Sequence, residues 1–432
     1  MSEKHMQGEA NSGMGRRDFL RAAGVAAATV AGTRAFAQAP ATAAGANDRI
    51  GVGVIGCGGR GNAHLGTLRK LKEAGDDTFE IVAVSDVYRP RLNKAADEYK
   101  VKGYMDHREL LADPNVDAVC IATPDHIHGY QAIDAVRAGK HVYCEKPVTH
   151  WRQFDLTKQL NEEVKKGSVR FQLGSQGQSD PAWTQMRKLI QEGLIGQPIV
   201  AECGYFRIGD WGEAGMPIDD PNAQPGADLN WEAFLGDSPK RDFDVSRFFR
   251  WRMYEDYAGG PVTDLYPHSL TPVVYMMGAG MPSSVVASGG KFRYDQREVP
   301  DTFSVLIDYP EKFTIAVLGT QGNAYSATGG RGAGGRIPVV RGWDGTLTVM
   351  NDEVAFIPAG GSDKPEKTFP LERKESQELY WKDFFRCCKT GDETLSPMDL
   401  AFRVQTALQM GFLSFREGKT AKFDPAEQKI VL

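Results

Sequence analysis

The chain has 432 residues, of which 41% are hydrophobic and 25% charged, and its formal net charge is −5. This length suits two globular domains, and a mildly acidic chain without a basic stripe argues against a nucleic-acid partner. No run of residues is long and apolar enough to span a bilayer as a helix, so we expect no stable membrane insertion.

The N-terminal residues resemble an export signal. The pair Arg16-Arg17 precedes a short Ala-rich apolar run, and Ala35-Phe36-Ala37 matches a signal-peptide cleavage pattern. We therefore expect residues 1–37 to be a twin-arginine signal peptide and residues 38–47 a linker. The chain would then reach the periplasm, or be exported otherwise, through the twin-arginine machinery. The alternative is a chance arginine pair in an N-terminal tail.

The first predicted strand, residues 50–55, runs into a glycine-rich turn that matches G-x-G-x-x-G. Gly56 allows the tight turn, Gly58 lets the backbone approach a pyrophosphate, and Gly61 lets the next helix pack closely against the strand. The N-terminus of that helix offers free N–H groups to phosphate oxygens. The motif therefore predicts a dinucleotide site that includes Gly56, Gly58, Gly59, Arg60 and Gly61.

A second predicted strand, residues 79–86, ends in Asp86. A carboxylate at this place accepts hydrogen bonds from the adenosine ribose and repels a 2′-phosphate, which favours NAD over NADP. Arg89 and Arg91 follow closely and weaken that preference. We therefore expect NAD as the cofactor, with NADP as the alternative.

Strand and helix signals continue to alternate along the first part of the chain. Strands are predicted at 117–122 and 141–145, with a helix between them at about 126–138. This alternation is typical of a parallel sheet with helices on both faces, whose ligands bind at the carboxyl ends of the strands. We therefore expect an α/β Rossmann domain over residues 48–170. The same rule adds to the cofactor site Thr123, Pro124, His126, His128, Glu145 and Lys146.

Metal binding is not expected. His126 and His128 suggest a metal pair, but no third ligand has suitable spacing. The six cysteines are scattered without zinc spacing, and we expect buried free thiols.

The run Glu145-Lys146-Pro147 resembles the Gfo/Idh/MocA oxidoreductases, which include glucose–fructose oxidoreductase and inositol dehydrogenase. The glycine motif, Asp86, Thr123–His128 and the run Ala138–Val142 carry the same resemblance, which covers roughly residues 48–415. A family motif of paired glycines, Asp and His matches Gly259-Gly260, Asp264 and His268. Many members place a further Asp three residues after the His, where this chain has Thr271.

The resemblance implies a catalytic arrangement of Lys146, Asp264 and His268. Positions i and i+4 share one face of a helix, so Asp264 and His268 would point together into a cleft. His268 would take the hydroxyl proton of the substrate, and Lys146 would stabilise charge on the reacting oxygen. Asp264 would orient the imidazole or hold the substrate, while hydride transfer belongs to the cofactor.

The second part of the chain has strands without regular helices between them. The predicted strands are 199–207, 282–289, 302–309 and 313–318, and helices return near 374–388 and 397–417. This pattern favours an α+β domain with an open, mostly antiparallel sheet, which we place at residues 171–420. The resemblance implies that the sheet covers the nicotinamide and forms a subunit contact, so we expect a homo-oligomer.

A long insert, residues 208–250, ends where aromatic residues alternate with arginines. Sugar rings stack on aromatic faces and arginines donate to hydroxyls, so the candidate substrate residues are Arg250, Trp251 and Tyr254, together with Gln176. The alternative is that Phe248, Phe249 and Trp251 belong to the core. The glycine-rich residues 327–336 fit either a lid or a simple loop.

These features predict an NAD(P)-dependent oxidoreductase that acts on a sugar, polyol or sugar derivative and keeps its cofactor tightly bound. One alternative is an NAD-dependent glycosidase or lyase that oxidises the sugar ring transiently, and another is a non-enzymatic sensor. Glu145-Lys146-Pro147 favours the oxidoreductase over the glycosidase, and the presence of Lys146, Asp264 and His268 together argues against a sensor.

Overall fold

The computed structural model describes residues 49–210, 215–361 and 364–432. Arg49 to Leu432 form one compact unit. The predicted signal peptide and linker lie outside the described residues. No helix in the described part of the chain is long and apolar enough to cross a membrane.

The first part of this unit is built on a six-stranded parallel sheet with the order β3-β2-β1-β4-β5-β6, which confirms the predicted Rossmann sheet. The strands are β1 (Ile50–Ile55), β2 (Phe79–Ser85), β3 (Lys102–Tyr104), β4 (Ala118–Ile121), β5 (His141–Glu145) and β6 (Phe171–Gly174). Every residue of β1 is buried, as expected for a central strand covered on both faces. The sheet runs to Gly174, beyond the boundary that we predicted at residue 170.

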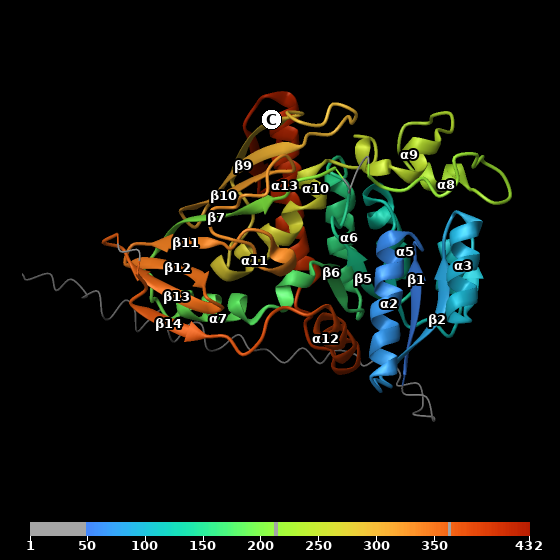
Figure 1. Ribbon diagram of the computed structural model, residues 1–432, viewed down its shortest axis with the longest axis horizontal. Coiled ribbons are helices and arrows are strands. Elements are labelled where there is room, and N and C mark those ends of the chain that lie inside the picture. Colours follow the sequence, from blue (N-terminus) through green and yellow to red (C-terminus); the bar gives the residue numbers. More distant parts are fainter. Residues whose placement is uncertain (1–48, 211–214, 362–363) are drawn as a thin grey trace, which may run out of the picture. The chain divides into compact units, whose positions relative to one another are not determined.

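Helices cover both faces of this sheet (Figure 1). One face packs on α2 (Gly59–Glu73) and α3 (Arg89–Tyr99), and the other on α4 (His107–Ala112), α5 (His128–Arg137) and α6 (Phe154–Lys166). The strands end in one row beneath the loops that carry Gly56, Asp86, Thr123 and Lys146. The topology therefore gathers four of the predicted site segments at one edge of the sheet.

The second part has a ten-stranded sheet with the order β14-β13-β12-β11-β7-β10-β9-β8-β15-β16. Its pairs are antiparallel except for β7 with β10, which confirms a mostly antiparallel sheet. The strands are β7 (Pro198–Phe206), β8 (Ser284–Gly290), β9 (Thr302–Tyr309), β10 (Phe313–Thr320), β11 (Val339–Gly342), β12 (Gly345–Met350), β13 (Glu353–Pro358), β14 (Lys367–Pro370), β15 (Ala421–Asp424) and β16 (Lys429–Val431).

One face of the large sheet is covered by helices and the other is open. Strand β10 alternates buried and partly exposed residues, with Phe313, Ile315 and Val317 turned to the helical face. The covering helices are α7 (Pro181–Gln191), α11 (Tyr266–Met277) and α13 (Met398–Glu417). This apolar layer is the main core of the second part and supports α11, the helix that carries His268.

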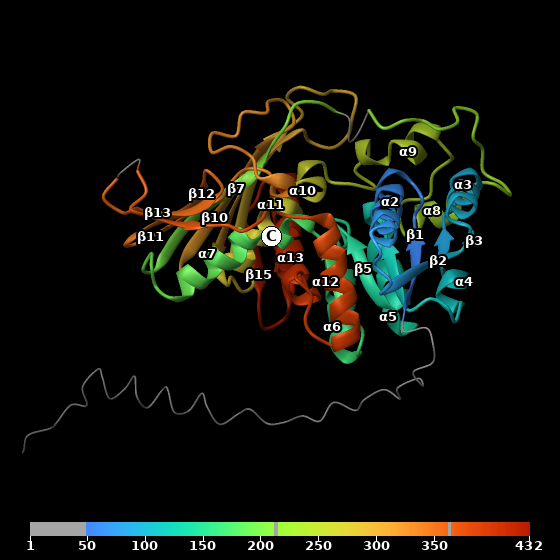
Figure 2. The same cartoon turned by 60° about the horizontal axis from the view of Figure 1, so that its bottom comes forward.

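Helix α12 (Gln377–Thr390) returns from the second part to cover the first sheet (Figure 2). Its Trp381 ring stacks on Tyr143 of β5 at 4.4 Å between centroids, and Phe385 stacks on Phe79 of β2 at 4.5 Å. The two parts therefore share a hydrophobic core. Five of the six cysteines are buried free thiols, as expected, and Cys388 is partly exposed.

The described part of the insert forms a small aromatic core of its own. It contains α8 (Trp231–Leu235) and α9 (Val245–Phe249), and a short 3-10 turn, Trp251–Met253, follows directly after the insert. Phe248 and Phe249 pack there with Tyr88, a residue of the loop after β2. Trp251 belongs to the same core, so the core interpretation holds for all three residues, although Phe248 and Trp251 also line the cavity described below. A bridge between Tyr88 and Leu229 fastens the insert to that loop.

Candidate active site

A cavity of about 1280 Å³ lies at the carboxyl ends of the Rossmann strands. It exceeds the roughly 300–1,000 Å³ of an ordinary small-molecule pocket and so has room for an extended ligand. The predicted residues that line it are Gly56, Gly58, Gly59, Arg60, Asp86, Thr123, Pro124, His128, Glu145, Lys146, Gln176, Trp251, Asp264 and His268. The predicted residues outside the lining are Gly61, His126, Arg250 and Tyr254.

The glycine loop has the geometry that its spacing predicts. Gly56 adopts a positive φ of 93°, and a Cβ there would lie 2.8 Å from the carbonyl of Ala122. A Cβ on Gly61 would lie 1.8 Å from the carbonyl oxygen of Gly56, so this glycine serves helix packing. Helix α2 begins after Gly58 without a side-chain cap, unlike α7, where Asp180 fills that role. Its first N–H groups therefore remain available to a phosphate.

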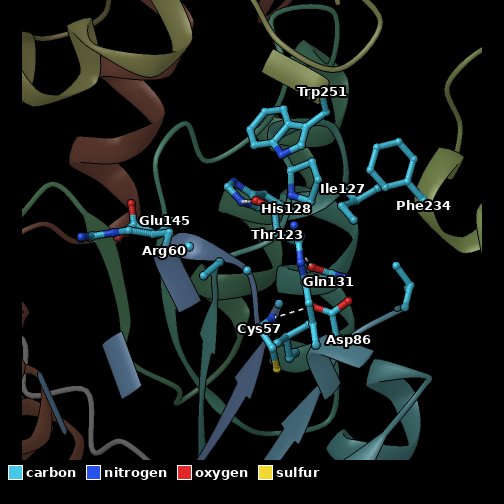
Figure 3. A pocket seen from close by; sticks show the side chains of 18 of the residues that line it. Cys57, Arg60, Asp86, Thr123, Ile127, His128, Gln131, Glu145, Phe234 and Trp251 are labelled. Atoms are coloured by element: carbon cyan, nitrogen blue, oxygen red, sulfur yellow. Dashed lines mark hydrogen bonds and ion pairs between the residues drawn. The ribbon is translucent and has the colours of Figure 1, made fainter. Parts of the chain in front are cut away.

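Asp86 joins the loops that follow β1 and β2 (Figure 3). Its Oδ2 accepts the Cys57 N–H at 2.7 Å, and its Oδ1 accepts the Tyr88 N–H at 2.8 Å. Burial raises the pKa of this carboxyl, although the nearby Arg91 opposes the shift. Each oxygen has further acceptor capacity, so the carboxylate fixes the loops and still presents acceptors to a ribose.

Glu145 is held by three donors on one oxygen. Arg60 Nε, His64 Nε2 and Gln176 Nε2 each lie 2.8 Å from Glu145 Oε1. Trp381 Nε1 donates to His64 Nδ1 at 3.2 Å, which leaves Nε2 as the protonated nitrogen of this imidazole. Burial would raise the pKa of Glu145, but Arg60 and His64 hold it well below its usual range. The network fixes the residue that precedes Lys146.

Lys146, Asp264 and His268 meet in the cavity. Lys146 Nζ lies 2.9 Å from Asp264 Oδ1 and 2.6 Å from the Asp264 carbonyl oxygen. Asp264 ends α10 (Pro261–Asp264), and His268 lies in the first turn of α11. His268 Nδ1 is buried and has no hydrogen-bond partner among the described residues. Burial, and then the charge of Lys146, lowers the pKa of His268 to about 3, so its imidazole is neutral near pH 7.

Two arginines that sequence reasoning missed also approach Asp264. Arg252 Nε lies 3.3 Å from Oδ1, and Arg207 Nη2 lies 3.6 Å from Oδ2. Burial would raise the pKa of Asp264, but Lys146, Arg252 and Arg207 together hold it far below its ordinary value. Arg252 lies in the aromatic–arginine run of the insert, which was a usable signal, whereas nothing in the local sequence marks Arg207.

Asp125 is a further buried acid beside this cluster. Its Oδ2 has no hydrogen-bond partner in the part of the chain that the structure describes. Burial raises its pKa to about 7, against the charges of Arg252 and Lys146. It lies two residues after Thr123 and was not singled out because an acid beside two histidines carries no motif signal.

His126, in the 3-10 turn after β4, and His128, the first residue of α5, contact backbone carbonyl oxygens. His126 Nε2 lies 2.6 Å from the Phe234 carbonyl oxygen in the insert, which removes this side chain from the cavity. The His128 ring nitrogens lie 2.7 Å from the Pro147 carbonyl oxygen and 2.6 Å from that of Thr123. Within the described ranges, no group of three His, Cys, Asp or Glu residues could hold a metal.

The candidate substrate residues separate in the structure. Trp251 lines the cavity opposite the strands (Figure 3). Arg250 Nε donates to the Met216 carbonyl oxygen at 2.9 Å, and the Tyr254 hydroxyl lies 2.8 Å from Ser246 Oγ. The first contact lies inside the insert, and the second joins Tyr254 to α9, the last helix of the insert. Gln176 reaches the cavity, but its amide nitrogen already donates to Glu145 and to Tyr143.

The glycine-rich segment 327–336 reaches the cavity through Ala333. Its Arg331 forms a two-point ion pair with the buried Asp180, with N–O distances of 2.7 and 3.1 Å. The Ala333 N–H also donates to Glu375 at 2.7 Å. These contacts hold residues 327–336 against the second part of the chain, which favours a fixed loop over a lid.

Comparisons with known proteins match both parts of the chain. Residues 50–175 match the Gfo/Idh/MocA model of an oxidoreductase family with an NAD-binding Rossmann fold. Residues 180–432 match the model of the C-terminal alpha/beta domain of that oxidoreductase family.

Two curated relatives are inositol dehydrogenases. The chain is 32% identical over 213 residues to the myo-inositol 2-dehydrogenase of Thermotoga maritima, covering 49% of this chain and 58% of the relative. It is 36% identical over 156 residues to inositol 2-dehydrogenase 1 of Saccharopolyspora erythraea, covering 36% and 45%. The chain spans about half the length of the curated relatives that it matches.

Solved structures share the fold over most of their length. The WlbA dehydrogenase of Bordetella pertussis, in complex with NADH and UDP-GlcNAcA, has a TM-score of 0.63 at 18% identity, covering 87% of this chain and 99% of that one. A levoglucosan dehydrogenase in complex with NADH has a TM-score of 0.65 at 19% identity, covering 87% and 99%.

Proposed function

Because this chain belongs to the Gfo/Idh/MocA oxidoreductase family, we propose that it is an NAD-dependent oxidoreductase acting on a hydroxyl or carbonyl of a sugar, polyol or sugar derivative. One observation carries the proposal. Lys146 Nζ, paired with Asp264, and the unpartnered Nδ1 of His268 line the same cavity as the glycine loop. The inositol and sugar dehydrogenases among the relatives support the substrate class.

The residues present fit a dinucleotide. The uncapped N-terminus of α2 suits the pyrophosphate, and a Cβ placed on Gly59 would meet no atom within 4 Å, so the backbone stays open to a ligand. Asp86 offers acceptors for the ribose hydroxyls. When bound, the nicotinamide ring supplies the two-electron acceptor or donor for the reacting carbon.

The protein residues supply proton transfer and charge stabilisation. His268 is neutral, and in the tautomer that carries its proton on Nε2, the Nδ1 atom, which has no partner among the described residues, can accept the proton of a substrate hydroxyl. Lys146 Nζ, held by Asp264, can donate a hydrogen bond to the reacting oxygen as negative charge develops on it. Asp264 thereby acts on Lys146, a role beyond the expectation that it orients the imidazole or holds the substrate.

The test uses the purified full chain. NAD reduction is followed at about 340 nm with neutral polyols, aldoses and sugar acids, for the wild type and for Lys146→Met. Substrate-dependent reduction that the variant loses while it still binds NAD supports the proposal. Cleavage of a glycoside without net reduction would replace it with the transient-oxidation alternative, and a chain that binds no dinucleotide would overturn it.

We further propose that the cofactor stays bound between turnovers. Segments of the insert close over the loops after β2 and β4, through the Asn230 N–H to the Val87 carbonyl at 2.9 Å and through His126 to Phe234. The measurement is the mass of any nucleotide released when the dialysed protein is denatured. Release of a stoichiometric nucleotide supports retention, and an empty protein contradicts it.

We also propose export to the periplasm through the twin-arginine machinery, with residues 1–37 as the signal peptide. The support is the order of Arg16-Arg17, the Ala-rich run and Ala35-Phe36-Ala37. Cell fractionation tests it. The wild type should appear in the periplasm, and a variant with both arginines replaced by lysine should stay in the cytoplasm.

We finally propose that the chain forms a homo-oligomer through the open face of the large sheet. Val286 of β8 and Leu306 of β9 pair across the strands and are 42% and 48% exposed. Exposed apolar neighbours on an open sheet face favour contact with a second copy. Light scattering on the wild type and on Leu306→Lys checks this, because the charge should shift the protein towards the monomer.

A further inference from the structure

Arg91 and Asp219 form an ion pair at the rim of the cavity, with 2.6 Å between Nε and Oδ2. We infer that this pair sets the preference for NAD over NADP, because Asp219 occupies the Arg91 guanidinium that would otherwise bind a 2′-phosphate. The inference rests on the proposed function, since it requires a dinucleotide in this cavity. It assigns a specificity role to Asp219, a residue of the insert that belongs to neither the glycine motif nor the end of β2.

Arg91 lies at the place where an adenosine ribose meets the fold. It is in the first turn of α3, directly after the loop that Asp86 begins. A Cβ built on Gly58 would be 3.2 Å from Arg91 Nη1, so the guanidinium packs beside the glycine loop. Its side chain is 24% exposed and lines the cavity. A 2′-phosphate on a ribose held by Asp86 would therefore lie within reach of this arginine.

The insert positions both partners of Arg91. Asp219 provides the carboxylate, and the ring of Phe249 lies 5.2 Å from the guanidinium carbon in a cation–π contact. The bridge between Tyr88 and Leu229 and the hydrogen bond from the Asn230 N–H to the Val87 carbonyl hold this part of the insert over α3. The guanidinium is thus oriented and charge-paired before any ligand enters.

The two acids beside Arg91 oppose a phosphate. Asp86 and Asp219 place carboxylates around the guanidinium of Arg91, and Lys94 of α3 also lines the cavity. An arginine binds a phosphate best when its donors and its positive charge are available. With Asp219 in place, a 2′-phosphate would meet an arginine whose positive charge is already neutralised by an ion pair, and it would also meet two carboxylates. A 2′-hydroxyl needs only a hydrogen-bond acceptor. The local sequence, in which Arg91 follows Asp86, left this preference open.

A second ion pair between the same elements provides a matched control. Arg89 Nε lies 2.8 Å from Asp228 Oδ1, and the Arg89 N–H also donates to the Asp228 carbonyl at 2.8 Å. Asp228→Asn therefore removes one charge pair between the insert and α3, as Asp219→Asn does. Arg89, however, is not among the residues that line the cavity. Only the Asp219 pair should affect cofactor choice.

The experiment measures the dissociation constants of NAD and NADP by calorimetry, for the cofactor-free wild type, Asp219→Asn and Asp228→Asn. Thermal melting confirms that each variant folds. We expect Asp219→Asn to raise the affinity for NADP relative to NAD by about tenfold or more, the factor that one charge-assisted hydrogen bond supplies. Asp228→Asn should leave the ratio unchanged. Adding Arg91→Gln to Asp219→Asn should abolish the gain.

The outcomes separate this inference from the proposed function. A wild type that binds NAD, with Asp219→Asn keeping the wild-type ratio, would overturn the specificity role and leave the oxidoreductase standing. An equal change in the NADP-to-NAD affinity ratio of Asp228→Asn would show that the insert affects binding only by holding α3 in place, which would also overturn the specificity role of Asp219. If Asp219→Asn does not fold, Asp219→Ser in the wild-type background takes its place with the same expectation. A wild type that binds neither nucleotide would overturn both.

Discussion

Lys146 Nζ contacts both the carboxylate and the backbone carbonyl of Asp264, residues separated by 118 positions in the chain. Lys146 follows strand β5 of the Rossmann sheet, and Asp264 ends the short helix just before α11. One contact therefore fixes the reacting groups and joins the two halves of the cavity. Because Lys146 also donates to the backbone carbonyl of Asp264, this contact depends only in part on the Asp264 carboxylate.

Replacing Lys146 should remove catalysis and spare the fold. In Lys146→Met, Asp264 keeps Arg252 as a partner at 3.3 Å, so the buried carboxylate is still compensated. We expect kcat to fall about 10²- to 10³-fold, the loss typical of one electrostatic donor at a reacting oxygen, while NAD binding is retained. Steady-state kinetics and calorimetry measure the two effects. Lys165→Met, which breaks an exposed pair with Asp399, is the control and should behave as the wild type.

The pKa of His268 predicts an unusual pH profile. Because burial lowers it to about 3, the imidazole stays neutral from pH 5 to 8 and should produce no acid limb in that range. His268→Asn should lower kcat by about 10²- to 10⁴-fold, as expected for a lost general base. The measurement is kcat/KM against pH. A limb near pH 6.5 that disappears in His268→Asn would contradict the buried, neutral imidazole.

Asp125 should make stability depend on pH. Its pKa of about 7 lies above that of an exposed aspartate because burial disfavours the charged form. The folded chain therefore holds this proton longer than the unfolded chain, so the free energy of unfolding should fall as pH rises from about 4 to about 7. Asp125→Asn should reduce this decrease in the free energy of unfolding by at most about 4 kcal/mol. Urea unfolding at pH 5 and pH 8 tests this, with the exposed Asp97→Asn as a control that keeps the wild-type slope.

Sequence reasoning reached the Rossmann half because its signals are local. Glycine spacing, an acid at the end of β2 and alternating strands and helices depend on neighbours along the chain. Arg207 could not be found this way, because its approach to Asp264 depends on β7 pairing in parallel with β10 in the second sheet. Strand β7 was predicted, but its neighbours were not.

At the end of the insert, sequence reasoning named residues that do not reach the cavity. Arg250, Trp251 and Tyr254 are close in sequence, yet only Trp251 lines the cavity. The chain makes a 3-10 turn at Trp251–Met253, which turns Arg250 towards Met216 and Tyr254 towards Ser246. Arg252 instead stacks on Trp251 and reaches Asp264. Composition indicated the right segment, but the side-chain directions depend on a turn that the sequence does not mark.

Two glycines of one motif should respond differently to the same substitution. A Cβ on Gly61 would lie 1.8 Å from the carbonyl oxygen of Gly56, and this backbone atom cannot move without displacing the turn between β1 and α2. Gly61→Ala should therefore destabilise the chain by about 1–3 kcal/mol, as overpacking typically does, or prevent folding.

Gly59, in contrast, would place its Cβ in open space within a helical turn, so Gly59→Ala should keep the wild-type melting temperature or raise it slightly. Because Gly59 lines the cavity, any loss in this variant should appear in NAD affinity alone. Thermal melting and calorimetry on both variants separate the two roles. Equal melting temperatures for Gly61→Ala and Gly59→Ala would contradict the close approach of α2 to β1 on which the dinucleotide site depends.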